Sequence, residues 1–248
     1  MGVTAIDPSS GKTFHHRADE PFAMCSTFKT YATAEVLRRT AAGTASLEES
    51  IAIEPVDLVE DSPVTSAAVG TSMTVRQLAE AALTRSDNTA GNQLLERIGG
   101  PAAVTALARD IGDDSTRLDR WEPELNAALR GDPRDTSTTR ELADGYRALL
   151  IGDALAPAER AQLVDWLRAS TTSDKRIRAG LPTGWTAADK TGAGRFGTVN
   201  DVGVVWDPAG RPLVLAVLTD SLSNREDAPR NNQVIADTTA AVIRALRG

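Results

Sequence analysis

The chain has 248 residues, of which 41% are hydrophobic and 25% are charged, and its formal net charge is −7. A chain of this length can bury a substantial core, as one large domain or as two closely packed ones. The acidic balance and the scattered Lys and Arg argue against a nucleic-acid partner, and no run reaches the roughly 18 apolar residues that a membrane span needs.

The start of the chain predicts strands and its middle predicts helices. Residues 3–6 and 12–16 read as two strands joined by a cluster of turn formers, which predicts an antiparallel hairpin. Apolar periodicity predicts a helix from Ser26 to about residue 39, and a long irregular stretch follows. Capping residues and prolines then mark five more helices, at 74–83, at 88–98 and starting at 101, 138 and 157.

The end of the chain returns to strands, at 186–190, 199–206 and 213–219, before a last helix at 232–247. This order predicts an α/β protein of the α+β kind, with one antiparallel sheet built from both termini, flanking helices and an inserted all-helical domain. We expect residues 1–25 and 170–248 to form the sheet domain and residues 26–169 the helical domain. The cleft between the two is the natural place for a site.

Ser26 and Lys29 are the first candidate catalytic pair. Three residues make almost one helical turn, so both side chains should emerge on the same face. A serine hydroxyl needs a group that accepts its proton, and a desolvated or cation-flanked lysine can become the neutral amine that does so. A Ser-x-x-Lys pattern also arises by chance about once per 250 residues, and helix capping by Ser26 explains it equally well.

The sequence contains only two histidines and one cysteine, so few sites could use these residues. His15 and His16 are the only histidines and are neighbours on a predicted strand, so a Ser-His-Asp triad or a histidine metal site is hard to build. The single Cys25 rules out an intrachain disulfide. We therefore expect a group other than histidine to activate Ser26.

Two tripeptides further along strengthen the interpretation of Ser26 as a nucleophile. Residues 86–88 read Ser-Asp-Asn at a predicted helix junction, and residues 190–192 read Lys-Thr-Gly at the end of a strand. Helix capping and an ordinary strand end explain each one alone, although chance predicts only about 0.04 and 0.1 occurrences. The three motifs in this order are the signature of class A β-lactamases and penicillin-binding proteins, and the chain resembles a class A β-lactamase over nearly its whole length.

A segment at 119–137 has no clear periodicity, and such segments in compact domains are usually functional or disordered. Its residues 120–126 look like the Ω-loop of the same family, whose carboxylate would here be Glu122. Arg120 and Asp135 could pair across the neck of the segment. The alternatives are a surface ion pair worth under about 1 kcal/mol and, for Glu122, a solvated loop acid.

The resemblance implies a role for each motif residue. Ser26 would attack the lactam carbonyl, with the backbone N–H groups of Ser26 and Ala193 as oxyanion hole. Lys29, or Glu122 through a water, would take the hydroxyl proton. Ser86 would pass a proton to the departing nitrogen.

The resemblance further implies that Glu122 and Asn126 hold the water that cleaves the acyl-enzyme. Lys190 and Thr191, next to Gly192, would receive the substrate carboxylate, and Asn88 the amide side chain. The expected ligand is thus a small β-lactam, with no metal, no cofactor, no nucleic acid and no membrane. We expect a monomer that is secreted or periplasmic in its native context, with its signal peptide removed.

Some positions depart from the family pattern. Many members carry an aromatic residue where this chain has Asp61, and many carry an arginine where it has Val199, a role that Arg176 could take over. Members usually begin with a helix beside the C-terminal helix, whereas this sequence begins at the first strand. We therefore expect lowered stability and an exposed apolar stripe on the last helix.

Two other functions compete with hydrolysis. A D,D-peptidase or penicillin sensor would be acylated but would deacylate slowly. A non-catalytic binding module would keep the fold and leave a cephalosporin intact.

Overall fold

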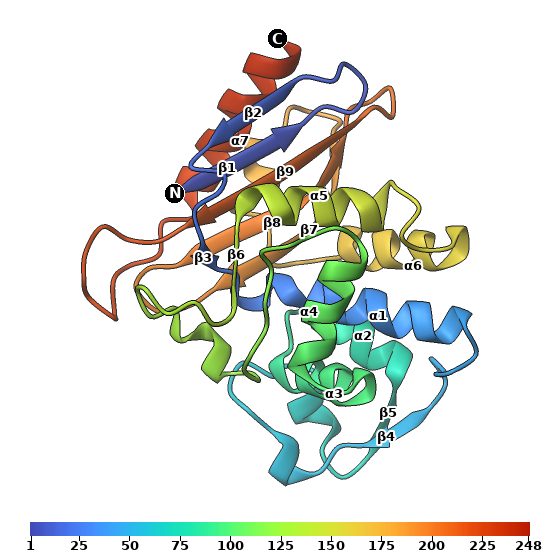
Figure 1. Cartoon of the computed structure of the whole chain (residues 1–248). Coiled ribbons are helices and arrows are strands. Elements are labelled where there is room, and N and C mark those ends of the chain that lie inside the picture. Colours follow the sequence, from blue (N-terminus) through green and yellow to red (C-terminus); the bar gives the residue numbers. More distant parts are fainter.

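The computed structural model describes residues 1–248 and contains a five-stranded antiparallel sheet in the order β2-β1-β9-β8-β7 (Figure 1). The chain termini meet in this sheet, because β1 pairs with β9 and places Val3 opposite Val217. This confirms the predicted α+β class. The strands of the sheet are β1 Gly2–Ile6, β2 Thr13–His16, β7 Thr186–Ala193, β8 Val199–Trp206 and β9 Pro212–Thr219.

The helices begin and end where local signals predict. Thr74 and Gln77 form a reciprocal capping box, prolines open α4 and α6, and Gly99 ends α3 with a left-handed φ of 94°. The helices are α1 Lys29–Ala41, α2 Val75–Thr84, α3 Asn88–Ile98, α4 Pro101–Asp110, α5 Thr139–Leu150, α6 Pro157–Arg168 and α7 Gln233–Arg247. None of them combines the length and the apolar character that crossing a bilayer requires.

Short elements correct two predictions. Ser26 lies in a 3₁₀ segment, η1, which precedes α1, and not in the first turn of an α-helix. The irregular stretch after α1 contains a paired β4 and β5, so the inserted part is not all-helical. The short elements are β3 Phe22–Ala23, η1 Cys25–Phe28, β4 Ser50–Ala52, η2 Pro55–Asp57, η3 Thr65–Ala68, β5 Ser72–Thr74, η4 Glu124–Ala127, β6 Thr136–Ser137 and η5 Arg178–Gly180.

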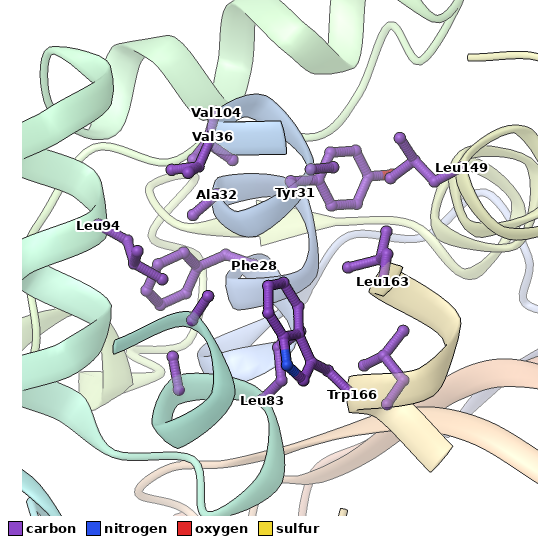
Figure 2. Packing of buried hydrophobic residues seen from close by; sticks show 14 of the residues in the cluster. Phe28, Tyr31, Ala32, Val36, Leu83, Leu94, Val104, Leu149, Leu163 and Trp166 are labelled. Atoms are coloured by element: carbon purple, nitrogen blue, oxygen red, sulfur yellow. The ribbon is translucent and has the colours of Figure 1, made fainter. Parts of the chain in front are cut away.

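The larger of two hydrophobic cores joins the helices to one face of the sheet. Figure 2 shows Phe28 and Tyr31 at its centre, among Leu94 of α3 and Leu163 and Trp166 of α6. The same core continues into buried residues of β7, β8 and β9, and α5 packs on these strands although it belongs to the predicted helical domain. The division at residues 25/26 and 169/170 therefore stays a prediction.

The smaller core lies between the other face of the sheet and α7. Ile235, Val242 and Ile243 of α7 are buried there. On the outer face of the helix only Ala241 and Ala245 are exposed among the apolar residues. The expected exposed stripe is thus reduced to two small side chains.

Candidate active site

A cavity of about 580 Å³ lies where η1, the α2–α3 junction and the end of β7 meet. Most of the predicted site residues contribute to its wall. Those that line it are Ser26, Ser86, Asn88, Asn126, Thr191, Gly192 and Ala193. Three others, Lys29, Glu122 and Lys190, are buried and contact wall residues from behind.

Ser26 occupies the centre of the hydrogen-bond network. Its hydroxyl donates to Glu122 Oε1 at 3.1 Å and accepts from Lys29 Nζ at 3.2 Å. The preceding residue, Cys25, has a left-handed φ of 48°. Because only a small fraction of non-glycine residues adopt this conformation, the backbone before the serine is strained. The Glu122 carboxylate and the Lys29 ammonium both contact the oxygen of Ser26.

Lys29 is fully buried among oxygen acceptors. Its Nζ lies 3.0 Å from Glu122 Oε1, donates to Asn88 Oδ1 at 2.6 Å and donates to the Ser86 carbonyl at 2.8 Å. Space for this side chain comes from Gly91 on α3, where a Cβ would lie 2.8 Å from Lys29 Cε. Surrounded in this way, Lys29 acts as a donor, and the serine proton points to Glu122.

Glu122 is fixed through its backbone and its carboxylate. The Asn92 side chain accepts from Glu122 N–H and donates to Glu122 C=O, both at 2.9 Å. The Asn126 amide donates to Glu122 Oε2. The side-chain oxygen of Asn126, Oδ1, is buried and has no hydrogen-bond partner, so an acceptor remains free beside the carboxylate.

The predicted ion pair between Arg120 and Asp135 closes the loop that carries Glu122. Arg120 Nε donates to Asp135 Oδ2 at 2.5 Å, and Asp135 also accepts from the backbone N–H groups of Asp119 and Arg120 at 2.8 and 2.9 Å. Asp135 is fully buried. The pair is therefore confirmed and is more than the surface contact considered as the alternative.

Lys190 and Ser86 form a second hydrogen-bonded pair, next to the contacts around Ser26. Lys190 Nζ donates to Ser86 Oγ at 2.8 Å and to the Thr191 carbonyl at 3.0 Å. Burial holds the pKa of Lys190 well below its usual value, and the positive charges of Lys29 and Arg176 lower it further. Ser86 itself has a left-handed φ of 56°.

Gly192 allows β7 to approach η1. A Cβ at this position would lie 2.7 Å from the Met24 carbonyl and 3.2 Å from Cys25 Cβ. No side chain fits in that space without moving the backbone. The glycine of the Lys-Thr-Gly motif therefore sets the distance between the strand and the segment that carries Ser26.

Arg176 does not reach the cavity, contrary to the expectation that it takes over a substrate-binding role. Its Nη1 donates to the carbonyls of Gly192 and Asn200, both at 2.8 Å, and its Nε to Asn232 Oδ1 at 2.8 Å. Burial lowers the pKa of this guanidinium. Arg176 thus supports the end of β7 from behind.

Sequence reasoning missed the two guanidinium groups that do line the cavity, Arg85 and Arg230. Arg230 donates weakly to the Gly194 carbonyl, at 3.3 and 3.4 Å. It precedes α7 and lies far along the chain from the motifs, so no local pattern marks it. Thr172, whose hydroxyl lies 2.7 Å from that of Thr191, was missed for the same reason.

Together these groups suit acyl transfer. A hydroxyl contacts a carboxylate that can take its proton, and a separate hydroxyl is held by a buried ammonium. Cys25, Asp61 and Ser86 all have left-handed backbones next to the cavity, and strain of this kind concentrates at functional sites.

Comparison with known proteins agrees with this chemistry. The sequence model of the beta-lactamase enzyme family matches residues 1–246. Beta-lactamase AST-1 of Nocardia asteroides is 50% identical over 246 residues, which are 99% of this chain and 79% of that protein. Beta-lactamase FAR-1 of Nocardia farcinica is 49% identical, covering 100% of this chain and 78% of that protein.

Solved structures give the same result. A β-lactamase from Desulfarculus baarsii is similar with a TM-score of 0.96 and 45% identity, over 100% of this chain and 91% of that one. An ancestral class A β-lactamase is similar with a TM-score of 0.93 and 52% identity, over 99% of this chain and 94% of that one.

Proposed function

The chain belongs to the class A β-lactamase family and is a hydrolase of that class, and from this premise we propose that it hydrolyses penicillins and cephalosporins through an acyl-enzyme on Ser26. The observation that carries the proposal is the contact of Ser26 Oγ with both Glu122 and Lys29. A hydroxyl held between a carboxylate and an ammonium can lose its proton as it attacks a carbonyl.

Acylation begins with Ser26. As its oxygen bonds to the lactam carbonyl carbon, the hydroxyl proton moves to Glu122 Oε1, to which it already donates. Lys29 donates to the same serine oxygen and stabilises its developing negative charge. The backbone N–H groups of Ser26 and Ala193, two residues of the cavity wall, would bind the carbonyl oxygen.

Opening the ring requires a proton on the departing nitrogen. Ser86 can supply it, because its hydroxyl lies in the cavity and accepts from Lys190. The nearby Lys29 donates to the Ser86 carbonyl and so fixes the position of the residue. The lactam C–N bond then breaks and leaves the acyl group on Ser26. Lys190 returns a proton to the Ser86 oxygen along their hydrogen bond, and the proton that Glu122 took from Ser26 passes through solvent in the cavity to Lys190, so that Glu122 is a carboxylate again.

Deacylation would use a water held by Glu122 and Asn126. The unpartnered Asn126 Oδ1 can accept a hydrogen bond from this water, and Glu122 can take its proton. As the water oxygen attacks the ester carbonyl and the ester bond breaks, Glu122 passes the water's proton to the Ser26 oxygen, which restores the hydroxyl and releases the opened product. The substrate carboxylate would lie by Thr191 and Lys190, and the amide side chain by Asn88.

The decisive experiment compares the unmodified protein with Glu122→Ala. We expect the unmodified protein to turn over benzylpenicillin, and the variant to deacylate about 10²- to 10⁴-fold more slowly, because it lacks the base that activates the water. Acylation of the variant should continue, because Lys29, which no longer has its ion pair with Glu122, can accept the proton of Ser26 in its place. Intact-protein mass spectrometry should then detect the penicilloyl adduct only on the variant. Glu80→Ala, at an exposed position of α2, is the matched control and should behave like the unmodified protein.

Other outcomes would favour the competing functions. A long-lived adduct on the unmodified protein would indicate a penicillin sensor or D,D-peptidase. No adduct and no product from a chromogenic cephalosporin would indicate a binding module. Unchanged turnover in Glu122→Ala would contradict the deacylation mechanism.

We also propose that the protein acts as a monomer, secreted or in a periplasm. The proposal rests on the small, self-contained site and on the family resemblance. Sedimentation of the purified protein tests the monomeric state.

A further inference from the structure

The catalytic cavity continues into a smaller groove of about 330 Å³, which we call the side groove. The two share Asp61, Asn126, Ala193 and Arg230. Three carboxylates line the side groove: Glu60 and Asp61 from the segment before η3, and Glu124 from the loop that carries Glu122. All three are exposed. Its cationic residues, Arg195 and Arg230, come from the sheet part of the chain.

The three carboxylates have no cationic partner. Arg195 forms an ion pair with Glu226, but no Lys or Arg nitrogen lies within 4.0 Å of a carboxylate oxygen of Glu60, Asp61 or Glu124. Charges of one sign that line a concave surface favour ligands of the other sign. The part of the side groove that Glu60, Asp61 and Glu124 line is therefore negative and unpaired, while Arg230 lines the groove from the sheet part of the chain.

This wall is tied to the residue proposed to hold the substrate's amide side chain. The Asp61 carbonyl accepts from the Asn88 backbone N–H at 3.1 Å, and the Glu60 carbonyl accepts from Asn88 Nδ2 at 3.0 Å. Substituents on a side chain bound at Asn88 would thus lie beside the two acidic residues. The substrate carboxylate would lie near Thr191 and Lys190, neither of which lines the side groove.

We propose that Asp61, supported by Glu60 and Glu124, makes this enzyme prefer β-lactams whose acylamino side chain carries a protonated amine. The inference rests on the proposed function and specifies its substrate class. A dipolar substrate would match the charges at both ends of the cavity. A second negative charge on the side chain would be repelled.

Three penicillins that differ only at the α-carbon of the side chain provide the test. Ampicillin carries an amine there, benzylpenicillin a hydrogen and carbenicillin a carboxylate. At low ionic strength we expect Asp61→Asn to lower the ampicillin-to-benzylpenicillin ratio of kcat/KM about fivefold and to raise the carbenicillin-to-benzylpenicillin ratio by a similar factor. Asn accepts the left-handed φ of 57° at this position, so the variant should fold.

Salt and a distant charge change provide the controls. Because exposed charges are screened within about 10 Å at 0.1 M salt, the effect of Asp61→Asn should shrink at 0.5 M salt. Glu80→Gln makes the same change in net charge on the exposed face of α2 and should leave both ratios unchanged.

The outcomes separate the two proposals. Ratios that Asp61→Asn does not change, or changes no more than Glu80→Gln does, would overturn the specificity inference while hydrolysis itself stands. Failure of the unmodified protein to hydrolyse any of the three penicillins would overturn the proposed function and the inference with it.

Discussion

Lys190 is a buried ammonium whose charge is easily lost. Burial, together with the charges of Lys29 and Arg176, holds its pKa well below the usual value for lysine. Its ammonium group donates a hydrogen bond to Ser86 Oγ, and its positive charge would attract the substrate carboxylate. Both contributions require the protonated form, so they disappear as the pH rises through the lowered pKa.

We therefore expect kcat/KM for benzylpenicillin to fall on the alkaline side well below pH 10.5, by about tenfold per pH unit once Lys190 titrates. Lys190→Arg should shift this alkaline limb to higher pH, because a guanidinium stays charged. The measurement is a pair of pH–rate profiles. Profiles that coincide on the alkaline side would exclude Lys190 as the titrating group.

At the residue scale, the sequence predicted the motif residues but not their surroundings. Ser26 and Lys29 contact each other because one turn separates them, which spacing alone predicts. Arg230 reaches the cavity only through the tertiary fold. The direction of Arg176 also depends on tertiary contacts, since carbonyls of β7 and β8 capture its donors.

At the scale of elements, α3 shows how packing serves the site. Its Gly91 faces Lys29, and the lysine lies over the backbone without a side chain between them. Glycine inside a helix costs about 1 kcal/mol relative to alanine. The position of Lys29 thus depends on a residue that weakens the helix.

Gly91→Ala should separate stability from activity. The Cβ would lie 2.8 Å from Lys29 Cε and displace the ammonium from Ser26 and Glu122, so we expect acylation to slow at least about tenfold. The gain in helix propensity should keep the melting temperature within a few degrees of the original. Pre-steady-state acylation rates and thermal unfolding measure the two effects. Unchanged acylation would show that Lys29 tolerates the shift.

Sequence patterns located the long elements better than the short ones. Caps such as Thr74 and Thr138 and the opening prolines act within one helical turn, so they can be read locally. The pairing of β4 with β5 and the 3₁₀ geometry of η1 depend on contacts with distant segments. For that reason local patterns indicate only an irregular stretch where β4 and β5 pair, and an α-helix where η1 is a 3₁₀ helix.

At the scale of the whole molecule, Arg247 connects parts of the sheet layer that are distant in sequence. Its guanidinium donates to both oxygens of Asp7, after β1, at 2.8 and 3.0 Å, and to Asp207, after β8, at 3.2 Å. It also donates to the Arg211 and Pro212 carbonyls. All three charged side chains are at least nine-tenths buried. The Arg247 side chain thereby connects α7 to the β1–β2 turn and to the β8–β9 turn.

Arg247→Ala should destabilise the fold without changing the chemistry. Removing one partner of a buried ion pair costs about 3–5 kcal/mol, so we expect the melting temperature to fall by about 6–20 °C and kcat to stay the same. Arg244→Ala is the matched control, because Arg244 is an exposed residue of the same helix that forms no ion pair. Equal melting temperatures for the two variants would show that the Arg247 contacts contribute nothing.

The pH dependence of stability gives an independent measure of the same contacts. The hydrogen bonds from Arg247 lower the pKa of Asp7 to about 2, against 3.8 for a free aspartate. Because the folded state holds this proton less tightly than the unfolded state, the stabilisation is complete above about pH 4 and is lost as the pH falls towards 2. In Arg247→Ala the Asp7 pKa should rise, so the free energy of unfolding should decrease less steeply over that range than in the unmodified protein. Urea unfolding at several pH values measures both slopes, and parallel slopes would exclude Arg247 as the cause.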